Sequence, residues 1–493
     1  MAAVNREPEL ERPAVRAAAV VAVAAACLAL FSLSRPGLLL GITPDVSAWF
    51  GGSVRLVHGA IPYRDFGFTQ PPGFVLLSSP LGLLSEAVGT RDALAVLRMC
   101  TPLLAAANVL LMGRLTRHLG APATTVGCAV VAFFPAELYA LRGPQLEPVE
   151  ILFCLMGAAL VFEGAGVAGS RRLGLGGVAF GFAAVVKLPA LLPALIAAGL
   201  CAAVRGRRAF PFATGAVLGF AVPALPFLLL APPAFVRDVV GTQLGRIPAS
   251  GRAPLETRLA DLSGASGVGV SGAAAVAWAS LLVAFVLVAF LVRRRRLNPL
   301  EWFAVCSTVA VAAAQLLPAR YLPHYAAFIA PFLGLLLAVS TARVVAALRA
   351  AKLNHGTALG VAAAAAAALL GTQAWAIHAE AAPDLAPAVD AVIPPGGCAL
   401  SDSPALLFTS NRFVSVRRGC NDVTDPEGAT LALGTGTPAA AAMWRDAFSH
   451  ADYVVTSRAI GAWPLLANSS VPAYASRHFR LVGSAGLFAY VRR

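Results

Sequence analysis

Charged residues are scarce in this sequence. They account for 13% of its 493 residues, while hydrophobic residues account for 58%. A soluble domain usually contains about 25% charged residues. Apolar runs such as 17–34, 272–292 and 358–377 approach the roughly 20 residues that a helix needs to cross a bilayer core. The composition therefore excludes a soluble globular protein and predicts an α-helical polytopic membrane protein.

The common catalytic and metal-binding signatures are also missing. The sequence contains no metal-ligand spacing, no P-loop and no Ser or Cys nucleophile motif. No cofactor is therefore expected, and nothing in the sequence supports a divalent cation. No internal repeat relates the two halves, although transporters often have one. No cleavage site follows the first apolar segment, so we expect a retained helix rather than a signal peptide.

Basic residues outnumber acidic ones, and the formal net charge is +14. They do not line one polar face, as they would in a nucleic-acid-binding protein. Instead they form short runs beside apolar segments, at 171–172, 205–208 and 293–296. Such runs are typical of cytoplasmic anchors. The predicted partner is the lipid bilayer, and no nucleic acid is expected.

Hydropathy and helix breakers predict about eleven transmembrane helices. The apolar segment 71–89 is short and contains Pro80, so we interpret it as a juxtamembrane helix at the outer surface. With that choice the short basic runs that flank the apolar segments lie on one side of the membrane, as the positive-inside rule requires. The predicted spans lie near residues 15–35, 93–113, 121–139, 149–167, 173–186, 188–204, 211–231, 273–292, 299–317, 325–347 and 357–378.

This topology divides the chain into two domains. Residues 1–378 form the transmembrane domain, with the loop 36–92 outside, and residues 379–493 form a small extracytoplasmic domain. Pieces such as "ADYVVTS" and "FRLVGSAGLFAYVRR" predict short strands with a terminal hairpin at "GSAG", and hence a mixed α/β fold. Cys398 and Cys420 are the only cysteines in this polar part. A disulfide between them is expected if this part faces an oxidising compartment.

Asp45 follows Pro44 at the exit of the first predicted helix. A carboxylate beside a low-dielectric surface is suited to act as a general base. Asp is also a favoured N-cap residue, so Asp45 alternatively caps the helix that begins with "VSAWFGG". The residues alone leave both interpretations open.

Further polar groups follow in two segments predicted to lie outside. Tyr63, Asp65 and Gln70 occur in a stretch punctuated by Pro and Gly, which is typical of a shaped loop. The alternative is a solvated turn. Glu147 begins a predicted helix, where an acidic side chain also interacts favourably with the helix dipole. The sequence of neither segment shows whether these side chains have a structural or a functional role.

Lys187 stands alone in the apolar run "GFAAVVKLPALLPALIAAG", close to Pro189. An ionisable group at membrane depth is costly and marks a functional site by default. The alternative is that Lys187 reaches the outer surface at a helix break. The stretch "PARYLPHYAAF" offers Arg320, His324 and Tyr325 on one turn, a set suited to gripping a phosphate.

The segment 232–272 is cationic although it is predicted to lie outside. It contains Arg237, Arg246 and Arg258 with few apolar residues between them. Cytoplasmic anchoring does not explain arginines on the outer side. They predict contact with an anionic lipid headgroup, with a solvated loop as the alternative.

The order of these features resembles one known family. A first helix is followed by an outer loop that starts with an acidic residue, a G-x-x-P-Y-x-D turn, a Q-P-P-G entry to a short helix, and a later K-x-P break. This order resembles the GT-C membrane glycosyltransferases, most closely the branch of protein O-mannosyltransferases and lipid A aminoarabinose transferases. The strongest local matches are "HGAIPYRDFGFTQPPGFVLL" and "RYLPHYAAFIAPFLGLLLA". The resemblance extends over residues 15–378.

The resemblance implies a GT-C type fold and an inverting glycosyltransferase of the cell membrane. A sugar of mannose or arabinose type would pass from a polyprenyl-phosphate donor to a glycan, lipid or protein acceptor on the outer face. The family's catalytic acidic residue falls on Asp45, followed here by Val46 where many members carry Glu. The resemblance implies donor-phosphate binding by Lys187, Arg246, Arg320, His324 and Tyr325, and acceptor or sugar binding by Tyr63, Asp65, Gln70 and Glu147.

Two other functions fit part of the pattern. A transporter or flippase of lipid-linked saccharides also needs cations near the membrane and acidic groups in a cavity. A non-catalytic envelope scaffold explains residues 379–493 but leaves Lys187 and the first loop without a purpose. Substitution of Asp45 separates the three, because only a transferase loses sugar transfer while it keeps lipid binding.

Overall fold

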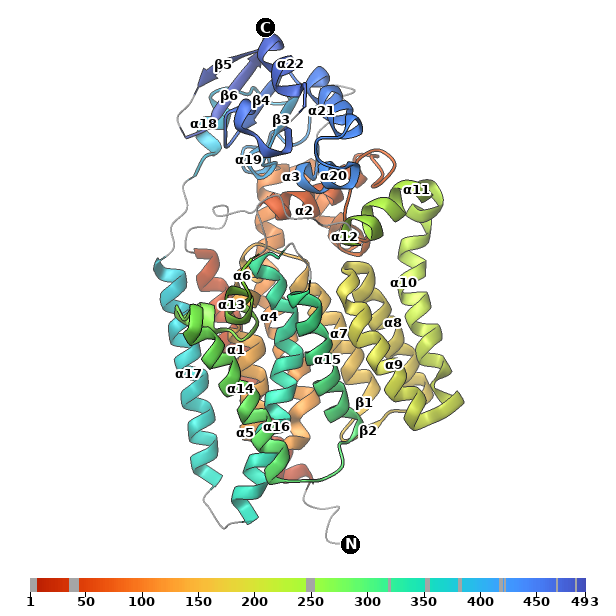
Figure 1. The fold of residues 1–493 in the computed structure, drawn as a ribbon, viewed down its shortest axis with the longest axis vertical. Helices are drawn as coiled ribbons and strands as arrows, with labels where there is room; N and C mark the ends of the chain where they lie inside the picture. The colour runs from red at the N-terminus through yellow and green to blue at the C-terminus, as the bar shows by residue number, and fades with distance from the viewer. Residues whose placement is uncertain are drawn as a thin grey trace. The chain divides into compact units, whose positions relative to one another are not determined.

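The computed structural model describes residues 7–34, 44–244, 253–317, 321–350, 355–379, 384–415, 420, 423–466, 469–483 and 486–493. The chain separates into two compact units, each built from three stretches that are distant in the sequence (Figure 1). Unit 1 comprises residues 1–35, 100–222 and 247–380, and unit 2 comprises residues 36–99, 223–246 and 381–493. Unit 2 therefore joins residues of the first loop to residues of the C-terminal part.

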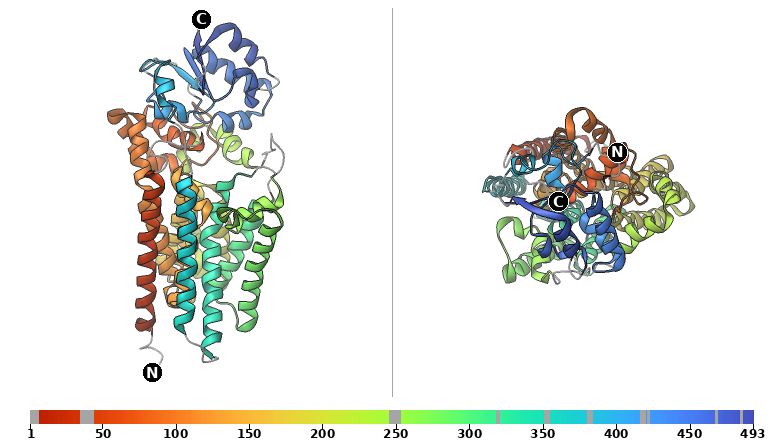
Figure 2. Two further views of the ribbon diagram at one scale, coloured as in Figure 1. Left: turned by 90° about the vertical axis from the view of Figure 1, so that its left-hand side faces the viewer. Right: turned by 90° about the horizontal axis from the view of Figure 1, so that it is seen from above.

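Unit 1 is a bundle of long, roughly parallel and antiparallel helices (Figures 1 and 2). A helix occurs at each of the predicted spans. Two shorter helices, α6 (Pro135–Arg142) and α13 (Leu255–Leu262), complete the bundle, and a two-stranded hairpin, β1 (Phe162–Glu163) with β2 (Gly166–Val167), joins α7 to α8. The main helices are α1 (Glu7–Ser34), α4 (Thr101–Thr116), α5 (Ala121–Phe133), α7 (Glu147–Val161), α8 (Ser170–Val186), α9 (Leu191–Arg205), α10 (Phe210–Leu230, which crosses into unit 2), α14 (Gly272–Val292), α15 (Pro299–Leu316), α16 (Ala330–Ala350) and α17 (His355–Ala379).

The lengths and composition of these helices agree with a multi-pass membrane protein. Within the described residues, seven helical stretches are long and apolar enough to cross a membrane, or eight if the bent pair α5 and α6 counts as one span. Two of the seven, Gly73–Leu119 and Leu188–Leu230, are 47 and 43 residues long. Since a helix rises about 1.5 Å per residue, each is about twice as long as one crossing requires. The second stretch turns at Gly206, whose φ of 56° favours glycine.

One predicted span begins later in the structure than in the sequence analysis, which expected it at 93–113. The helix α3 (Gly73–Met99) continues through Pro80 and bends at Gly89, where φ is 85°. The next helix, α4, begins at Thr101 with Pro102 in its first turn, a favoured position for proline. Residues 93–99 therefore belong to α3 and to unit 2. The sequence does contain signals for this break, because Arg98 interrupts the apolar run before Cys100 and Pro102 is typical of a helix start.

Small residues let α8 and α10 approach each other closely. A Cβ atom placed on Gly177 would lie 2.1 Å from the carbonyl oxygen of Phe212, and one placed on Gly215 would lie 2.1 Å from that of Gly174. Such backbone contact is typical of the small-xxx-small motifs that drive helix association in membranes. Any side chain larger than hydrogen at either glycine would push the two helices apart.

The start of α15 is fixed by local hydrogen bonds. Asn298 accepts a hydrogen bond from the Glu301 backbone N–H, and Glu301 accepts one from the Asn298 backbone N–H, which forms a capping box. The same Glu301 carboxylate is buried and pairs with Arg343 at 2.9 Å and Arg295 at 2.8 Å. One acidic side chain thus caps α15 and holds α16 against it.

Unit 2 contains a core that α2 (Pro44–Val57) shares with the C-terminal residues. Phe50 is buried against Phe408, and Phe408 stacks on Phe413 with ring centroids 4.1 Å apart. On another side, Ser53 of α2 hydrogen-bonds Ser78 of α3 at 2.6 Å. The remaining helices of unit 2 are α11 (Pro232–Phe235), η4 (Val236–Gly241), α12 (Thr242–Leu244), α18 (Ala386–Asp390), α19 (Ala405–Thr409), α20 (Pro426–Leu433), α21 (Pro438–His450) and α22 (Val471–His478).

A four-stranded sheet forms the second part of unit 2, in the order β3-β4-β6-β5. The strands β5 and β6 pair antiparallel as the hairpin expected around "GSAG", and β3 lies parallel to β4. Buried aromatic side chains of Trp444, Phe448 and Trp463 pack beside the sheet. The strands are β3 (Ala399–Ser401), β4 (Tyr453–Thr456), β5 (Phe479–Gly483) and β6 (Phe488–Arg492).

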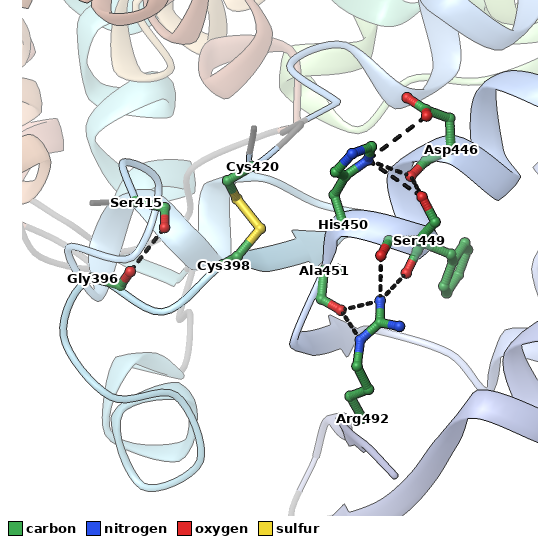
Figure 3. The surroundings of a disulfide bond; sticks show 10 residues. Gly396, Cys398, Ser415, Cys420, Asp446, Ser449, His450, Ala451 and Arg492 are labelled. Atoms are coloured by element: carbon green, nitrogen blue, oxygen red, sulfur yellow. Dashed lines mark hydrogen bonds and ion pairs between the residues drawn. A yellow bond between two sulfur atoms is a disulfide. The ribbon is translucent and has the colours of Figure 1, made fainter. Parts of the chain in front are cut away.

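Cys398 and Cys420 form a disulfide next to this sheet (Figure 3). Cys398 directly precedes β3, and its backbone oxygen accepts a hydrogen bond from the Tyr453 N–H at the start of β4. Nearby, Arg492 of β6 donates to the carbonyl oxygens that end α21, including that of Ala451 at 2.7 Å. The disulfide ties the edge strand β3 to the segment that contains Cys420, and Arg492 ties the inner strand β6 to the end of α21.

Candidate active site

Lys187 lies where the helix α8 ends inside the bundle of unit 1. Its backbone is extended, with φ −154° and ψ 131°, and a short 3-10 turn, η2 (Leu188–Ala190), leads into α9. Pro189 lacks a backbone N–H and cannot continue α8 in regular geometry. The broken helix directs the lysine side chain into the bundle, where the residue is only 9% exposed.

Three side chains from two other elements surround Lys187. Its ammonium forms an ion pair with Glu147 at the start of α7, and it lies 4.4 Å from the centre of the Tyr325 ring. His324 Nε2 is 3.7 Å from the same Glu147 carboxylate. Tyr325 and His324 come from the 3-10 helix η6 (Pro323–Ile329). We call Lys187, Glu147, His324 and Tyr325 the Lys187 cluster.

Two more buried carboxylates accompany this cluster. Glu137 of α6 and Glu150 of α7 are 1% and 0% exposed, and their carboxylate oxygens make no hydrogen bond with the described residues. Both interact electrostatically with Glu147. Acidic groups in and around the cluster therefore outnumber cationic ones. The sequence analysis missed Glu137, although an acidic residue within the predicted span 121–139 was a signal.

Neighbouring contacts fix the geometry of the cluster. The Tyr139 ring of α6 stacks on His324 with centroids 6.4 Å apart and planes 17° apart. Asn108 of α4 donates a hydrogen bond to the Pro148 carbonyl oxygen at 3.0 Å, which holds the first turn of α7. Four elements of unit 1 thus hold the polar groups in place before any substrate binds.

Asp45 lies in unit 2, in the first turn of α2. The helix already begins at Pro44, so Asp45 is a residue of the helix and not its N-cap. Its carboxylate is still placed to interact favourably with the positive end of the helix dipole. The side chain is half-buried. The cap interpretation from the sequence is therefore replaced by a first-turn position, which leaves a role as base open.

Tyr63, Gln70 and Asp65 shape the turn that follows α2. Tyr63 adopts a φ of 69°, a strained value for a residue other than glycine, and its hydroxyl donates to the Gln70 carbonyl oxygen at 2.6 Å. Burial raises the pKa of Tyr63 well above its ordinary value, so the phenol stays a neutral donor. The Arg64 guanidinium, together with the Ile61 backbone N–H, lowers the pKa of the Asp65 carboxyl.

A buried aspartate that the sequence analysis overlooked lies beside this turn. Asp238 of η4 is 0% exposed, accepts a hydrogen bond from Arg237 Nε at 2.7 Å, and accepts one from the Phe68 backbone N–H at 3.3 Å. Burial raises the pKa of Asp238 above its ordinary value, although Arg237 opposes that shift. The irregular π-helical backbone at 236–241 gave no periodic signal in the sequence.

The turn, η4 and α20 enclose a cavity of about 220 Å³ in unit 2. Its charged lining consists of Arg64, Asp65, Arg237 and Asp238, while Met443 and Leu433 are among its apolar lining residues. Mixed walls of this kind suit a hydroxyl-rich ligand, since carboxylate and guanidinium groups hydrogen-bond to hydroxyls.

The predicted site residues divide between the two units. Lys187, Glu147, His324 and Tyr325 gather in unit 1, so Glu147, predicted for the acceptor or sugar, lies beside residues predicted for the phosphate. Asp45, Tyr63, Asp65 and Gln70 belong to unit 2. Arg246 and Arg320 lie outside the described residues. Among the residues that are described, no group of three or more His, Cys, Asp or Glu side chains is arranged to hold a metal ion.

The family model for glycosyltransferase family 87 matches residues 68–314, half of the chain. No curated protein sequence matches the chain. The match begins in the first loop and includes Lys187, Glu147 and Asp238.

Solved structures of two proteins share the fold. ArnT from Cupriavidus metallidurans, in the apo state and bound to undecaprenyl phosphate, aligns with a TM-score of 0.62 and 16% identity over 96% of this chain and 97% of ArnT. The oligosaccharyltransferase of Archaeoglobus fulgidus, tethered to an acceptor peptide, aligns with a TM-score of 0.55 and 12% identity over 95% of this chain and 74% of that enzyme. These alignments confirm the predicted GT-C membrane fold.

Proposed function

Because the chain belongs to glycosyltransferase family 87, we propose that it transfers one sugar from a polyprenyl-phosphate donor to an acceptor hydroxyl at the outer face of the membrane. Family membership favours a transferase over a flippase or a scaffold. The undecaprenyl phosphate held by ArnT, which has the same fold, supports a polyprenyl carrier. The sugar is of the mannose or arabinose type, and the acceptor is a glycan, lipid or protein of the envelope.

The observation that carries this proposal is the Lys187 cluster. A lysine that is buried at a helix break inside an apolar bundle, with a histidine and a tyrosine beside it, is costly to maintain. A departing polyprenyl phosphate carries the negative charge that such cations stabilise. We assign leaving-group stabilisation to Lys187, His324 and Tyr325, and assign to Glu147 the positioning of Lys187. Arg246 and Arg320 remain predicted for the same phosphate.

The acceptor side of the reaction needs a base and a surface that binds hydroxyl groups. The acceptor O–H proton passes to the Asp45 carboxylate while the acceptor oxygen attacks the anomeric carbon. The bond between that carbon and the phosphate oxygen breaks, and the polyprenyl phosphate leaves as an anion. A single displacement of this kind inverts the anomeric configuration. We assign acceptor binding to the turn shaped by Tyr63 and Gln70 and to the exposed carboxylate of Asp65.

The test compares lipid-linked sugars and envelope glycans in a deletion strain that carries wild-type protein, Asp45→Asn or Asp92→Asn. The last variant makes the same substitution at an exposed position of α3 and is the matched control. We expect Asp45→Asn to leave the glycan missing and its polyprenyl-phosphate donor accumulated, which identifies the sugar. Full complementation by Asp45→Asn at equal protein level would show that Asp45 is not the general base.

A further inference from the structure

A second polar cavity lies in unit 1, where it is lined by α1, α4, the 3-10 helix η1 (Arg117–Leu119), α7, the β1–β2 hairpin and α8. The cavity has a volume of about 420 Å³. The β1–β2 hairpin and the start of α1 lie at the same end of unit 1 (Figure 1). The charge pattern of the sequence predicts this end to be cytoplasmic. The Lys187 cluster contributes no residue to the lining.

The charges around this cavity do not balance. Three arginines and two glutamates line it, so one positive charge is left over even when His118 is neutral. Arg117 pairs with Glu11 at 3.6 Å, and Arg172 pairs with Glu163 at 3.0 Å. The remaining arginine, Arg114, makes no hydrogen bond or ion pair with the described residues. The surplus positive charge is therefore centred on Arg114.

A second polar group in the cavity also lacks an internal partner. The Nε2 atom of His118 is buried and makes no hydrogen bond with the described residues. Arg172, in contrast, is anchored, because it donates to the Ala159 carbonyl oxygen at 2.9 Å as well as pairing with Glu163. The cavity thus combines a rigid arginine, an uncompensated arginine and an unused ring nitrogen. A phosphate group, with several acceptor oxygens, accepts from Arg114 and from the His118 ring when Nε2 carries the proton.

We propose that this cavity binds the phosphate group of an anionic phospholipid, with Arg114 as its main contact. Basic pockets between transmembrane helices on the cytoplasmic side are known to take such headgroups. The cavity lies where the apolar stretches that contain α1 and α4 end, so we expect it to lie near the lipid phosphates of the bilayer. Inorganic phosphate offers the same chemistry without the acyl chains. This site is independent of the sugar-transfer mechanism.

The test measures binding to the full-length protein in detergent with short-chain phosphatidylglycerol, short-chain phosphatidylcholine and inorganic phosphate as separate probes. Arg114→Gln is the test variant. Arg208→Gln, in an exposed basic run that does not line the cavity, is the matched control. We expect Arg114→Gln to weaken binding of phosphatidylglycerol about fivefold, which corresponds to one arginine contact near the membrane surface. Arg208→Gln should leave it unchanged.

A variant that should raise the affinity for phosphatidylglycerol makes the test more specific. Glu163→Gln removes one negative charge and frees Arg172, so it should bind phosphatidylglycerol more tightly than the wild type. If inorganic phosphate binds with the same dependence on Arg114 and competes with the lipid, the phosphate group alone is the ligand. Equal weakening by Arg114→Gln and Arg208→Gln, or no weakening by either, would overturn the proposal, because general surface attraction would then explain the binding.

Discussion

Each unit of this protein contains a fully buried carboxylate that is paired with a cation, but the two cations differ in their access to water. In unit 1 the Glu147 side chain is 1% exposed and its partner Lys187 is 11% exposed. In unit 2 the Asp238 side chain is 0% exposed, while its partner Arg237 is 44% exposed. The Lys187–Glu147 pair is thus enclosed in an apolar bundle, while the Arg237–Asp238 pair is in contact with solvent.

The difference determines what each pair contributes. Desolvation of both partners makes the Lys187–Glu147 pair weak evidence for stability, yet removal of one partner leaves an uncompensated buried charge. Asp238 is less dependent on its cation, because the Phe68 backbone N–H also donates to it. A buried pair that contributes little net stability but is costly to break is expected to be retained for function. A half-exposed pair beside a loop cavity needs no such explanation.

The largest effect is expected from Lys187→Ala, which breaks the enclosed pair. The uncompensated Glu147 carboxylate should lower the free energy of unfolding by about 3–5 kcal/mol, and sugar transfer should be lost. The double variant Lys187→Met with Glu147→Gln removes both charges and should recover most of the thermal stability without recovering transfer. Thermal unfolding in detergent and a donor-consumption assay measure the two effects separately.

The control for this prediction is Glu256→Gln, which removes an exposed acidic group of α13 in unit 1. It should alter neither stability nor transfer. If the double variant transfers sugar at the wild-type rate, the Lys187 cluster is structural and the phosphate assignment is wrong.

A second, smaller effect distinguishes the two units through their cysteines. The described cysteines of unit 1 are unpaired, while Cys398 and Cys420 of unit 2 are bonded across 22 residues. Replacing both bonded cysteines with serine should destabilise unit 2 by about 3 kcal/mol, since the unfolded chain gains freedom. Limited proteolysis should then cut near the sheet of unit 2 while the helices of unit 1 stay intact. Equal protection of both units would contradict the prediction.

The smallest effect concerns the half-exposed pair and its pH dependence. Burial raises the pKa of Asp238, so folding favours the protonated carboxyl. The contribution of Asp238 to stability should therefore be largest below its unfolded pKa, near about pH 4, and should fall as the pH rises through the folded pKa. Asp238→Asn keeps an acceptor for the Phe68 N–H and should remove this slope in the unfolding temperature.

Arg237→Gln tests the same pair from the side of the cation. Its guanidinium is half-exposed, so the loss should be about 1 kcal/mol or less, well below that of Lys187→Ala. A loss as large as that of Lys187→Ala would erase the distinction between the two pairs.

Much of the helical architecture could be predicted from the sequence, because an apolar run of about 20 residues has few alternatives to a transmembrane helix. Lys187 was identified for the same reason, since one charge in an apolar run is conspicuous. The hairpin of β5 and β6 followed from the turn residues between two alternating segments. In each case a local pattern carried enough information by itself.

Other features depended on contacts between distant segments. Asp238 lies in a π-helical turn without a periodic pattern. The sequence did not indicate that Glu147 pairs with Lys187, 40 residues further along the chain. No local rule specifies which cation a buried carboxylate meets.

The sequence was enough to identify a helical membrane protein with a small mixed C-terminal part. Hydropathy and turn residues are local properties, and each acts on its own segment of the chain. The tertiary structure alone decided which ionisable side chains meet, since burial, pairing and cavities arise where separate segments pack. The pairing of Lys187 with Glu147, the cavity lined by Asp238 and the cavity lined by Arg114 therefore appeared only in the folded chain.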